Sequence, residues 1–323
     1  MSKKTKKIIV EVPHRISGFF EIVDKINGVK ISDPERIGSR GAGLCLSAKG
    51  KTEVITENLT SDNEFKVNIY INGNKVNQSA ETTSFIVNYI KKLIRNPVKI
   101  RINHFFDLPV GCGYGASGAG ALGTIFGLND LYNLGLSDHE KGRIAHIAEV
   151  ENHTGLGTIC GQLNGGIGIV KEPGYPCIYE RINIPPNIKI ICGSFGMIHT
   201  KSILTDPVLN DKIKEAGKIA LRRLIQNPNI KSFMNVSLEF VKNSEILDIL
   251  KLLKVKELID DLNRLNIIGA SMNQLGRSVF AICGKEKETE VLNVMESYSP
   301  EIKIFSTFIH QKKSIVIRKG KEL

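Results

Sequence analysis

The stretch LPVGCGYGASGAGALG, residues 108–123, contains six glycines, one serine, one cysteine and no charged residue. The alternating segment before it, residues 98–106, predicts a strand, and the apolar spacing after it predicts a helix to about residue 133. A strand, a glycine-rich loop and a helix N-terminus form an anion site, because free N–H groups attract the anion and glycines let it approach. Ser117 falls near the first turn, where a hydroxyl can cap the helix or bind magnesium.

Two better-known nucleotide motifs do not fit this stretch. A P-loop of the form GxxxxGK[ST] requires a lysine after the glycines, and none follows. The dinucleotide pattern GxGxxG fits residues 113–118 only in a displaced register. Tight packing of a glycine-rich helix explains the composition equally well, so composition alone leaves phosphate binding and packing as alternatives.

The overall composition is that of a globular protein. Of the 323 residues, 41% are hydrophobic and 24% are charged, and no apolar run reaches the roughly 18 residues of a transmembrane helix. The formal net charge is +11, with much of the excess at the two ends, where we interpret it as solvated surface. Basic residues are not interleaved with aromatic ones, so we do not expect nucleic-acid binding.

The six cysteines stand at positions 45, 112, 160, 177, 192 and 283, without a CxxC pair or zinc spacing. In a chain of this length, such scattered cysteines are typical of reduced, buried thiols, and we therefore expect a cytoplasmic protein. Glu11 and Pro13 interrupt the apolar N-terminal run, which excludes a signal peptide there. A homodimer is expected only because dimers are the commonest assembly.

Strand and helix patterns alternate through the chain and predict an α+β fold. A cluster of prolines places a domain boundary near residue 183. We expect an N-terminal α/β domain with the glycine loop at residues 1–183 and a C-terminal α+β domain at residues 184–323.

Local patterns give more detailed expectations. Residues 7–23 predict a strand, a loop and a second strand, and the Asn-Gly pair within 64–77 predicts a hairpin. Residues 79–94 predict a helix, with Phe85, Tyr89 and Leu93 on one stripe. Further helices are expected at 137–155, which begins with a Ser137–Glu140 capping box, at 206–226, 230–241 and 245–263, and over EKETEVLNVMESY at 286–298.

The segment PVGCGYGASGA (109–119) resembles the phosphate loop of the GHMP small-molecule kinases, written P-x-G-x-G-x-G-S-S-A-A. Ala116 and Gly118 depart from the usual Ser and Ala. Near the N-terminus, VPHRISGFFE (12–21) resembles the family's first motif. Three further segments, GSRGAGLCLS (38–47), AEVENHTGLGT (148–158) and GASMNQLGRSVFA (269–281), resemble one branch of the family, so the resemblance covers nearly the whole chain.

The resemblance implies a two-domain GHMP kinase fold with a ferredoxin-like C-terminal domain, and an enzyme that transfers a phosphoryl group from ATP to an alcohol. Ser117 and Glu149 align with the family's Mg²⁺ ligands, which are the hard oxygen donors that this ion prefers. The residues expected to bind ATP are Pro109, Gly111, Gly113, Tyr114, Gly115, Ala116, Ser117, Gly118 and Ala119.

The catalytic base is where the sequence departs from the family pattern. The aspartate expected after the glutamate helix is Thr158 here, and a second register places Cys160 there. The family's first-motif lysine is absent, unless His14 or Arg15 replaces it. His153 and Glu151 are the remaining candidates for a base, although a loose transition state asks little of the nucleophile.

The expected acceptor is a small hydroxy acid with a carboxylate, which arginine recognises well through its two-pronged guanidinium. Arg40, among the glycines of GSRGAG, is the preferred residue, with Ser39 assisting it. The rest of the expected substrate-binding set is Arg15, His146, which lies one helical turn before Glu149, and Thr158.

Two alternatives remain open from the sequence. The acceptor could be homoserine, shikimate or a mevalonate-like acid, since the family includes such enzymes. The chain could also be a non-catalytic binding protein on this fold, which Thr158 favours. Retention of both Ser117 and Glu149 argues against that second alternative.

Overall fold

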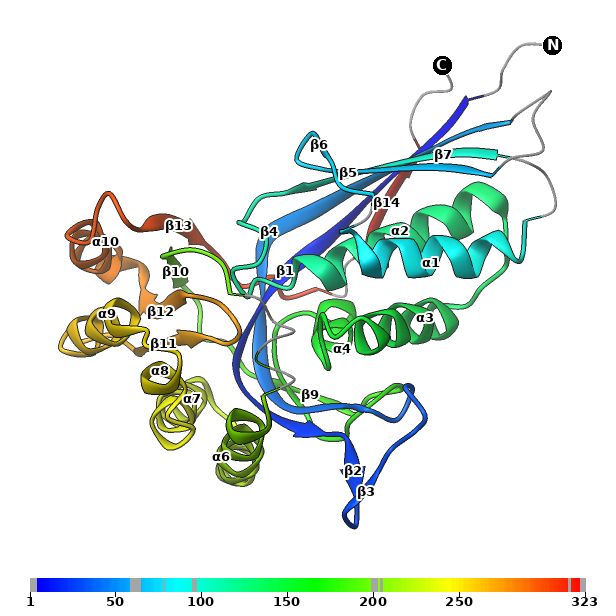
Figure 1. Cartoon of the computed structure of the whole chain (residues 1–323). Coiled ribbons are helices and arrows are strands. Elements are labelled where there is room, and N and C mark those ends of the chain that lie inside the picture. Colours follow the sequence, from blue (N-terminus) through cyan, green and yellow to red (C-terminus); the bar gives the residue numbers. More distant parts are fainter. Residues whose placement is uncertain are drawn as a thin grey trace.

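The computed structural model describes residues 5–58, 65–77, 79–94, 98–198, 203, 206–312 and 315–319. The chain forms an eight-stranded sheet, a four-stranded sheet and a two-stranded hairpin, with helices packed on the two larger sheets (Figure 1). This arrangement confirms the predicted α+β class.

Two long strands, β1 (Thr5–Val23) and β4 (Gly38–Asn58), pair antiparallel along most of their lengths and run through the centre of the molecule (Figure 1). The prediction of two strands and a loop within residues 7–23 was wrong. The register shifts between Pro13 and Arg15, and again between Ser17 and Phe19. The first of these bulges accommodates Pro13, which lacks an N–H, without ending the strand.

The larger sheet has the order β14-β1-β4-β7-β5-β6, and β8 extends it by pairing with β4 and β9. Asn72 and Gly73 form the predicted hairpin turn, both with positive φ, as an Asn-Gly turn requires. The bounds of the other strands are β5 (Lys66–Ile71), β6 (Asn74–Lys75), β7 (Val98–Phe106), β8 (Ile167–Val170), β9 (Tyr179–Ile182) and β14 (Val316–Lys319), with the separate hairpin formed by β2 (Lys25–Ile26) and β3 (Val29–Lys30).

Helices α1 (Glu81–Lys91), α2 (Ala116–Tyr132) and α3 (Asp138–Glu151) lie together beside the larger sheet (Figure 1). The capping box that starts α3 is confirmed. The predicted stripe on α1 was wrong, because the helix buries Ile86, Val87 and Ile90 and exposes Tyr89 and Leu93. A short helix, α4 (Thr158–Asn164), was missed because glycines surround it.

The four-stranded sheet has the order β11-β12-β10-β13 and is antiparallel throughout. With helices between β10 and β11 and between β12 and β13, it forms the βαββαβ pattern of ferredoxin-like domains, as predicted. The elements are β10 (Ile188–Ser194), α6 (Pro207–Gln226), α7 (Ile230–Asn243), α8 (Ile246–Ile249), α9 (Leu253–Asn263), β11 (Gly269–Asn273), β12 (Ser278–Gly284), η1 (Lys285–Lys287), α10 (Glu288–Glu296) and β13 (Lys303–Thr307). The helix expected at 245–263 is divided into α8 and α9, where Lys251 has a positive φ.

The two halves are closely joined. The division proposed at residue 183 falls between β9 and β10, while the last strand, β14, returns to pair with β1. One apolar cluster includes Phe20 and Leu44 of the long strands together with Phe233 and Phe280 of the second half. Of the helices in the described residues, none is both long and apolar enough to cross a bilayer.

Cys160 of α4 and Cys177 form a disulfide with Cα atoms 6.2 Å apart, while the other four cysteines are free and buried. The expectation that all six thiols are reduced was therefore wrong for this pair. The loop after β8 brings Cys177 back against α4, which their spacing in sequence does not reveal. A cytoplasmic location stays a prediction, and the expectation of six reduced thiols no longer supports it.

His104 on β7 is a buried histidine that connects the sheet to α1. Its Nδ1 lies 2.9 Å from the Thr52 hydroxyl, and its Nε2 lies 3.1 Å from the Thr83 hydroxyl. The ring also stacks on Phe106. Burial lowers the pKa of His104 to about 4, so the folded protein holds it neutral.

We predict that this histidine makes folding sensitive to acid. In the unfolded chain its pKa is near 6.5, so protons favour unfolding as the pH falls from about 6.5 toward 4. Between pH 7 and pH 4.5, His104 should account for a decrease of about 2 to 3 kcal/mol in the free energy of unfolding. Urea unfolding at both pH values should show a smaller loss for His104→Gln than for the wild type. His139→Gln, on exposed α3 surface, is the matched control, and equal losses in all three proteins would contradict the prediction.

Candidate active site

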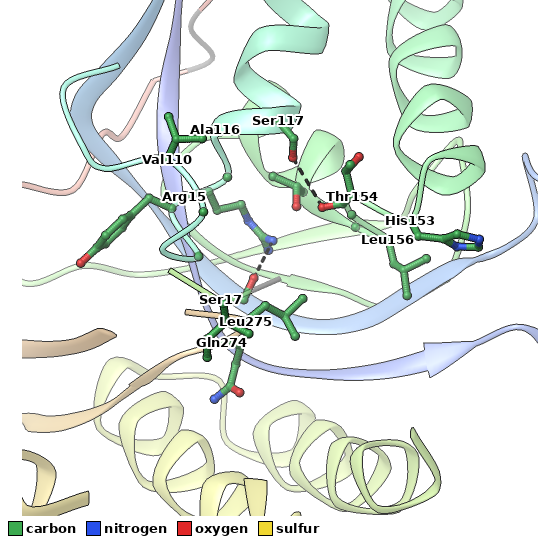
Figure 2. Close-up of a pocket in the computed structure, with 18 of the residues that line it drawn as sticks. Arg15, Ser17, Val110, Ala116, Ser117, His153, Thr154, Leu156, Gln274 and Leu275 are labelled. Carbon is green, nitrogen blue, oxygen red and sulfur yellow. Dashed lines mark hydrogen bonds between the residues drawn. The ribbon is translucent and has the colours of Figure 1, made fainter. Parts of the chain in front are cut away.

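A cavity of about 430 Å³ lies where the two halves meet. Its walls are the glycine loop and the start of α2, the turn between α3 and α4, the bulged part of β1, and the turn after β11 (Figure 2). The cavity therefore joins residues that are far apart in sequence, from Arg15 to Leu275.

The glycine loop enters the cavity with an unusual backbone. Gly111, Gly113 and Gly115 have φ values of +76°, +85° and +66°, in the left-handed region that other residues rarely adopt. Gly115 is the N-cap of α2 and offers no capping side chain. The first N–H groups of the helix are therefore left for a ligand, as the sequence predicts for a phosphate site.

Hydrogen bonds fix the loop by its carbonyl oxygens. His14 Nδ1 lies 2.9 Å from the Tyr114 oxygen, and the Arg15 N–H donates to the same oxygen. Gln162 Nε2 donates to the Gly115 oxygen at 2.9 Å. From the second half, the amide of Asn273 and the hydroxyl of Ser278 donate to the Cys112 oxygen. These partners hold the carbonyl groups and leave the loop's N–H groups for an anion.

Gly118, one of the departures from the family pattern, has a structural reason. A Cβ at this position would lie 2.5 Å from Gln162 Oε1, 3.0 Å from Thr158 Cγ2 and 3.3 Å from Glu149 Oε2. Alanine would therefore collide with the group of side chains that supports the loop. The glycine lets α4 and α3 approach the first turn of α2 closely.

Ser117 and Glu149 come together beside the cavity. Ser117 lines it, and its Oγ donates to the Thr154 carbonyl oxygen at 3.5 Å. The Glu149 side chain is 1% exposed, and its Oε2 atom has no hydrogen-bond partner within the described residues. Burial raises the pKa of Glu149 to about 7, against the opposing effect of the nearby Ser117 and Thr154 hydroxyls.

This pair fits a magnesium ion. A buried carboxylate oxygen without a partner is costly, and a cation would satisfy it. The described residues contain no cluster of three or more His, Cys, Asp or Glu side chains suited to a metal. A kinase site does not need one, because Mg²⁺ keeps several waters and takes other oxygens from phosphate groups.

Arg15 also lines the cavity, and its Cβ lies beside Gly115 at the start of α2. It is 6% exposed, its Nη1 donates to Ser17 Oγ at 3.3 Å, and its Nε is buried without a partner among the described residues (Figure 2). It is the one lysine or arginine among the described lining residues. The same lining includes apolar Phe20, Leu156 and Leu275 and polar Ser17, Ser39 and Gln274. Beside the loop, the cavity can therefore bind a small anion that also has apolar surface.

The chain is similar to known proteins in sequence and in fold. Residues 82–166 match the family described as GHMP kinases N terminal domain. The chain is 32% identical to a pantoate kinase of Methanocaldococcus jannaschii over 291 residues, 88% of this chain and 96% of that protein. A pantoate kinase of Thermococcus kodakarensis is 30% identical over 280 residues, 85% of this chain and 87% of that protein.

The chain belongs to the GHMP kinase family. A solved structure described as a phosphotransferase related to the CoA biosynthesis pathway has the same fold, with a TM-score of 0.81 and 25% sequence identity. That similarity covers 98% of this chain and 99% of the other one.

In this GHMP kinase, most of the residues predicted for ATP lie at the cavity, while Pro109, Gly118 and Ala119 do not line it. Arg15, Ser39 and Thr158, predicted for the substrate, do line it. The predicted residues that line the cavity from the loop side are Gly111, Gly113, Tyr114, Gly115, Ala116 and Ser117.

The structure does not bring Arg40 and His146 into the cavity of this GHMP kinase. Arg40 forms a two-pronged ion pair with Glu21, with nitrogen–oxygen distances of 2.8 and 3.1 Å. His146 is buried, forms a hydrogen bond with the Ile37 oxygen and stacks on Tyr175, because its turn of α3 packs against the loops that contain these two residues. Neither side chain supports a role in substrate binding.

Neither fallback base is well placed. The exposed side chain of His153 is at the rim and points away from Arg15 and Ser117 (Figure 2). Glu151 is exposed and does not line the cavity. Thr158 lines it with a side chain that cannot act as a carboxylate base.

Several contributing residues were missed from the sequence. Within the segment 269–281, which carried part of the resemblance, Gln274 and Leu275 line the cavity. Thr154 lies inside the segment 148–158 that carried the resemblance, and Gln162 follows that segment, so the sequence pointed to the region of both residues. Nothing in the sequence pointed to Thr82 on α1, because its contact with Thr154 joins segments 72 residues apart.

We predict that Gly113→Ala disrupts phosphate binding. The new side chain would strain a left-handed residue by about 1–2 kcal/mol, and its Cβ would lie 2.8 Å from the Gln274 carbonyl oxygen. A displaced loop should lower kcat/KM for ATP by about 100-fold. Steady-state kinetics measure this effect.

Gly28→Ala is the matched control for that experiment. Gly28 has a φ of +81°, but nothing lies within 4 Å of its Cβ position, and it is far from the cavity in the β2–β3 turn. The Gly28→Ala variant should unfold more easily than the wild type because of the backbone strain, but its kcat/KM for ATP should be unchanged. Equal activity of the two variants would contradict the role given to the loop.

Proposed function

We propose that this GHMP kinase phosphorylates pantoate on its primary hydroxyl with ATP, giving 4-phosphopantoate. The segments 38–47, 148–158 and 269–281 are similar to archaeal pantoate kinases, and the relatives named above carry that description. The product would enter the archaeal route to coenzyme A, in agreement with the description of the similar solved structure.

The observation that carries the choice of acceptor is the environment of Arg15. Pantoate has a carboxylate, two hydroxyls and two methyl groups on one carbon. A single buried arginine suits the carboxylate, and Phe20, Leu156 and Leu275 suit the methyl groups. Ser39 and Gln274 offer polar atoms for the hydroxyls. We therefore assign acceptor binding to Arg15 in place of Arg40.

ATP would bind with its phosphates on the loop. The left-handed glycines and the first turn of α2 present N–H groups there, while the partners of the loop carbonyls keep this backbone fixed. Such a preformed set of donors needs little reorganisation as negative charge shifts during transfer.

Ser117 and Glu149 would hold Mg²⁺ against the phosphates. When bound, the ion neutralises charge on the phosphate oxygens and orients the transferred group. Glu149 must be ionised for this role, and a nearby cation favours the ionised carboxylate despite its burial.

Phosphoryl transfer here proceeds without a carboxylate base at position 158. The acceptor oxygen attacks the γ-phosphorus as the bond to ADP breaks, and the hydroxyl proton leaves to a phosphate oxygen or to water. A loose transition state builds little charge on the attacking oxygen, so the chain's main contribution is to position the acceptor. Arg15 and the apolar wall provide that positioning.

An acceptor panel tests the proposal. Pantoate, homoserine, shikimate and mevalonate are compared in an ATP-consumption assay with Mg²⁺, and the product is checked for the added phosphate. We expect pantoate to be turned over with kcat/KM at least about 100-fold above the others, a difference of about 3 kcal/mol. Efficient turnover of another acid with pantoate inert would overturn the choice of acceptor.

Two arginine variants test which residue recognises the carboxylate. Arg15→Gln should lower kcat/KM for pantoate by about 100-fold or more, because it removes a buried charged donor. Arg40→Gln breaks the pair with Glu21 outside the cavity and should alter stability more than the KM for pantoate. The opposite result would return the role to Arg40. If the Arg15→Gln variant turns over pantoate as well as the wild type does, the assignment of acceptor binding to Arg15 is wrong.

A further inference from the structure

The two carboxylate oxygens of Glu149 have different surroundings. Oε1 accepts a hydrogen bond from Thr154 Oγ1 at 3.2 Å, a shorter contact than the 3.4 Å from the same hydroxyl to the Glu149 backbone oxygen, whereas Oε2 is buried without a partner within the described residues. The side chain is therefore held by one oxygen and leaves the other free.

Thr154 is itself held from behind. Its Oγ1 lies 2.9 Å from Oγ1 of Thr82, in the first turn of α1. A hydroxyl has one proton to donate, and an ionised carboxylate can only accept. When Thr154 donates to Glu149, the proton between the two threonines must therefore come from Thr82. The result is a directed chain from Thr82 through Thr154 to Glu149.

Glycines form the opposite wall of this side chain. A Cβ on Gly155 would lie 2.2 Å from Glu149 Oε2, and one on Gly118 would lie 3.3 Å from it. Oε2 thus occupies space that exists only because these residues are glycines. It is on the side of Gly118, the neighbour of Ser117 in the first turn of α2.

We propose that Thr154, supported by Thr82, is a positioning residue for the magnesium-binding carboxylate, an inference that rests on the metal site of the proposed function. Thr154 occupies Oε1, so that Glu149 meets the ion through Oε2 alone, next to Ser117. Outer partners of this kind usually set metal affinity, and their loss costs roughly 10- to 100-fold.

The hydrogen bonds from Thr82 through Thr154 to Glu149 also give α1 a role in the site. Glu81, which starts this helix, and Ser79 before it line the cavity, and Thr82 follows directly. The way α1 packs on the sheet therefore sets the orientation of a side chain on α3.

Metal binding in the absence of acceptor tests the proposal. Mn²⁺ replaces Mg²⁺ as a probe visible by electron paramagnetic resonance, and its Kd is measured with a non-hydrolysable ATP analogue. Thr154→Val, which keeps the shape and removes the hydroxyl, should weaken Mn²⁺ binding about 10- to 100-fold. Thr154→Ser restores the donor and should bind within about threefold of the wild type. Thr82→Val should give a smaller loss in the same direction.

Thr83→Val is the matched control. Thr83 is the next residue of α1, is as buried as Thr82 and also loses a hydrogen bond on this change, but its partner is His104. It should lower the melting temperature without changing the Kd of Mn²⁺. In activity assays, excess Mg²⁺ should restore much of kcat to Thr154→Val, which loss of folded structure would not allow.

Glu149→Gln separates this inference from the proposed function. If Glu149→Gln weakens Mn²⁺ binding and Thr154→Val does not, or if Thr83→Val weakens it equally, the positioning role is wrong while the metal site stands. If Glu149→Gln leaves Mn²⁺ binding unchanged, the metal assignment itself fails, and this inference with it. Pantoate being inert in the acceptor panel affects neither result.

Discussion

The backbone of the glycine loop is the constraint on which the rest of the site depends. Its N–H groups can face the cavity only if its carbonyl groups face elsewhere and have partners there. His14 from β1, Gln162 from α4, and Asn273 and Ser278 from the second half supply them. Those partners explain why the loop stands where the two halves meet. They also explain why so many buried polar side chains gather behind it.

The same crowding sets the electrostatics of the site. The cavity has few charges: Arg15 and Glu81 are the charged residues among its described lining, and Glu149 lies buried behind it. Arg15 and Glu149 are buried, so water screens their charges little, whereas Glu81 is exposed. Because the protein supplies so few charges here, charged ligands would have to neutralise one another as well as Arg15 and Glu149. An anionic acceptor, a nucleotide and a divalent cation would balance one another there.

The sequence was sufficient for the parts of the site that depend on local patterns. The glycine register marked the loop that lines the cavity, the alternation before it marked β7, and the capping box marked the start of α3. What failed was decided by partners distant in sequence. Arg40 looks free among its glycines, but Glu21 lies opposite it on the paired strand.

Other failures have the same cause. Arg15 was ranked after Arg40 for the substrate, because the bulge in β1 that accompanies its place at the cavity is not visible in the sequence. The Cys160–Cys177 bond and the contact between Thr82 and Thr154 are likewise tertiary contacts, which periodicity does not encode. The outward face of α1 was misjudged because packing against neighbours, and not helical spacing alone, selects the buried stripe.

The return of β14 to β1 has a consequence for synthesis on the ribosome. Residues 316–319 pair with residues 8–11, so this part of β1 receives its outer neighbour only after more than three hundred further residues have been made. Until then residues 8–11 form an open edge, and open edges invite pairing with other chains. The nascent protein must therefore keep this edge from pairing with other chains until residues 316–319 have been made.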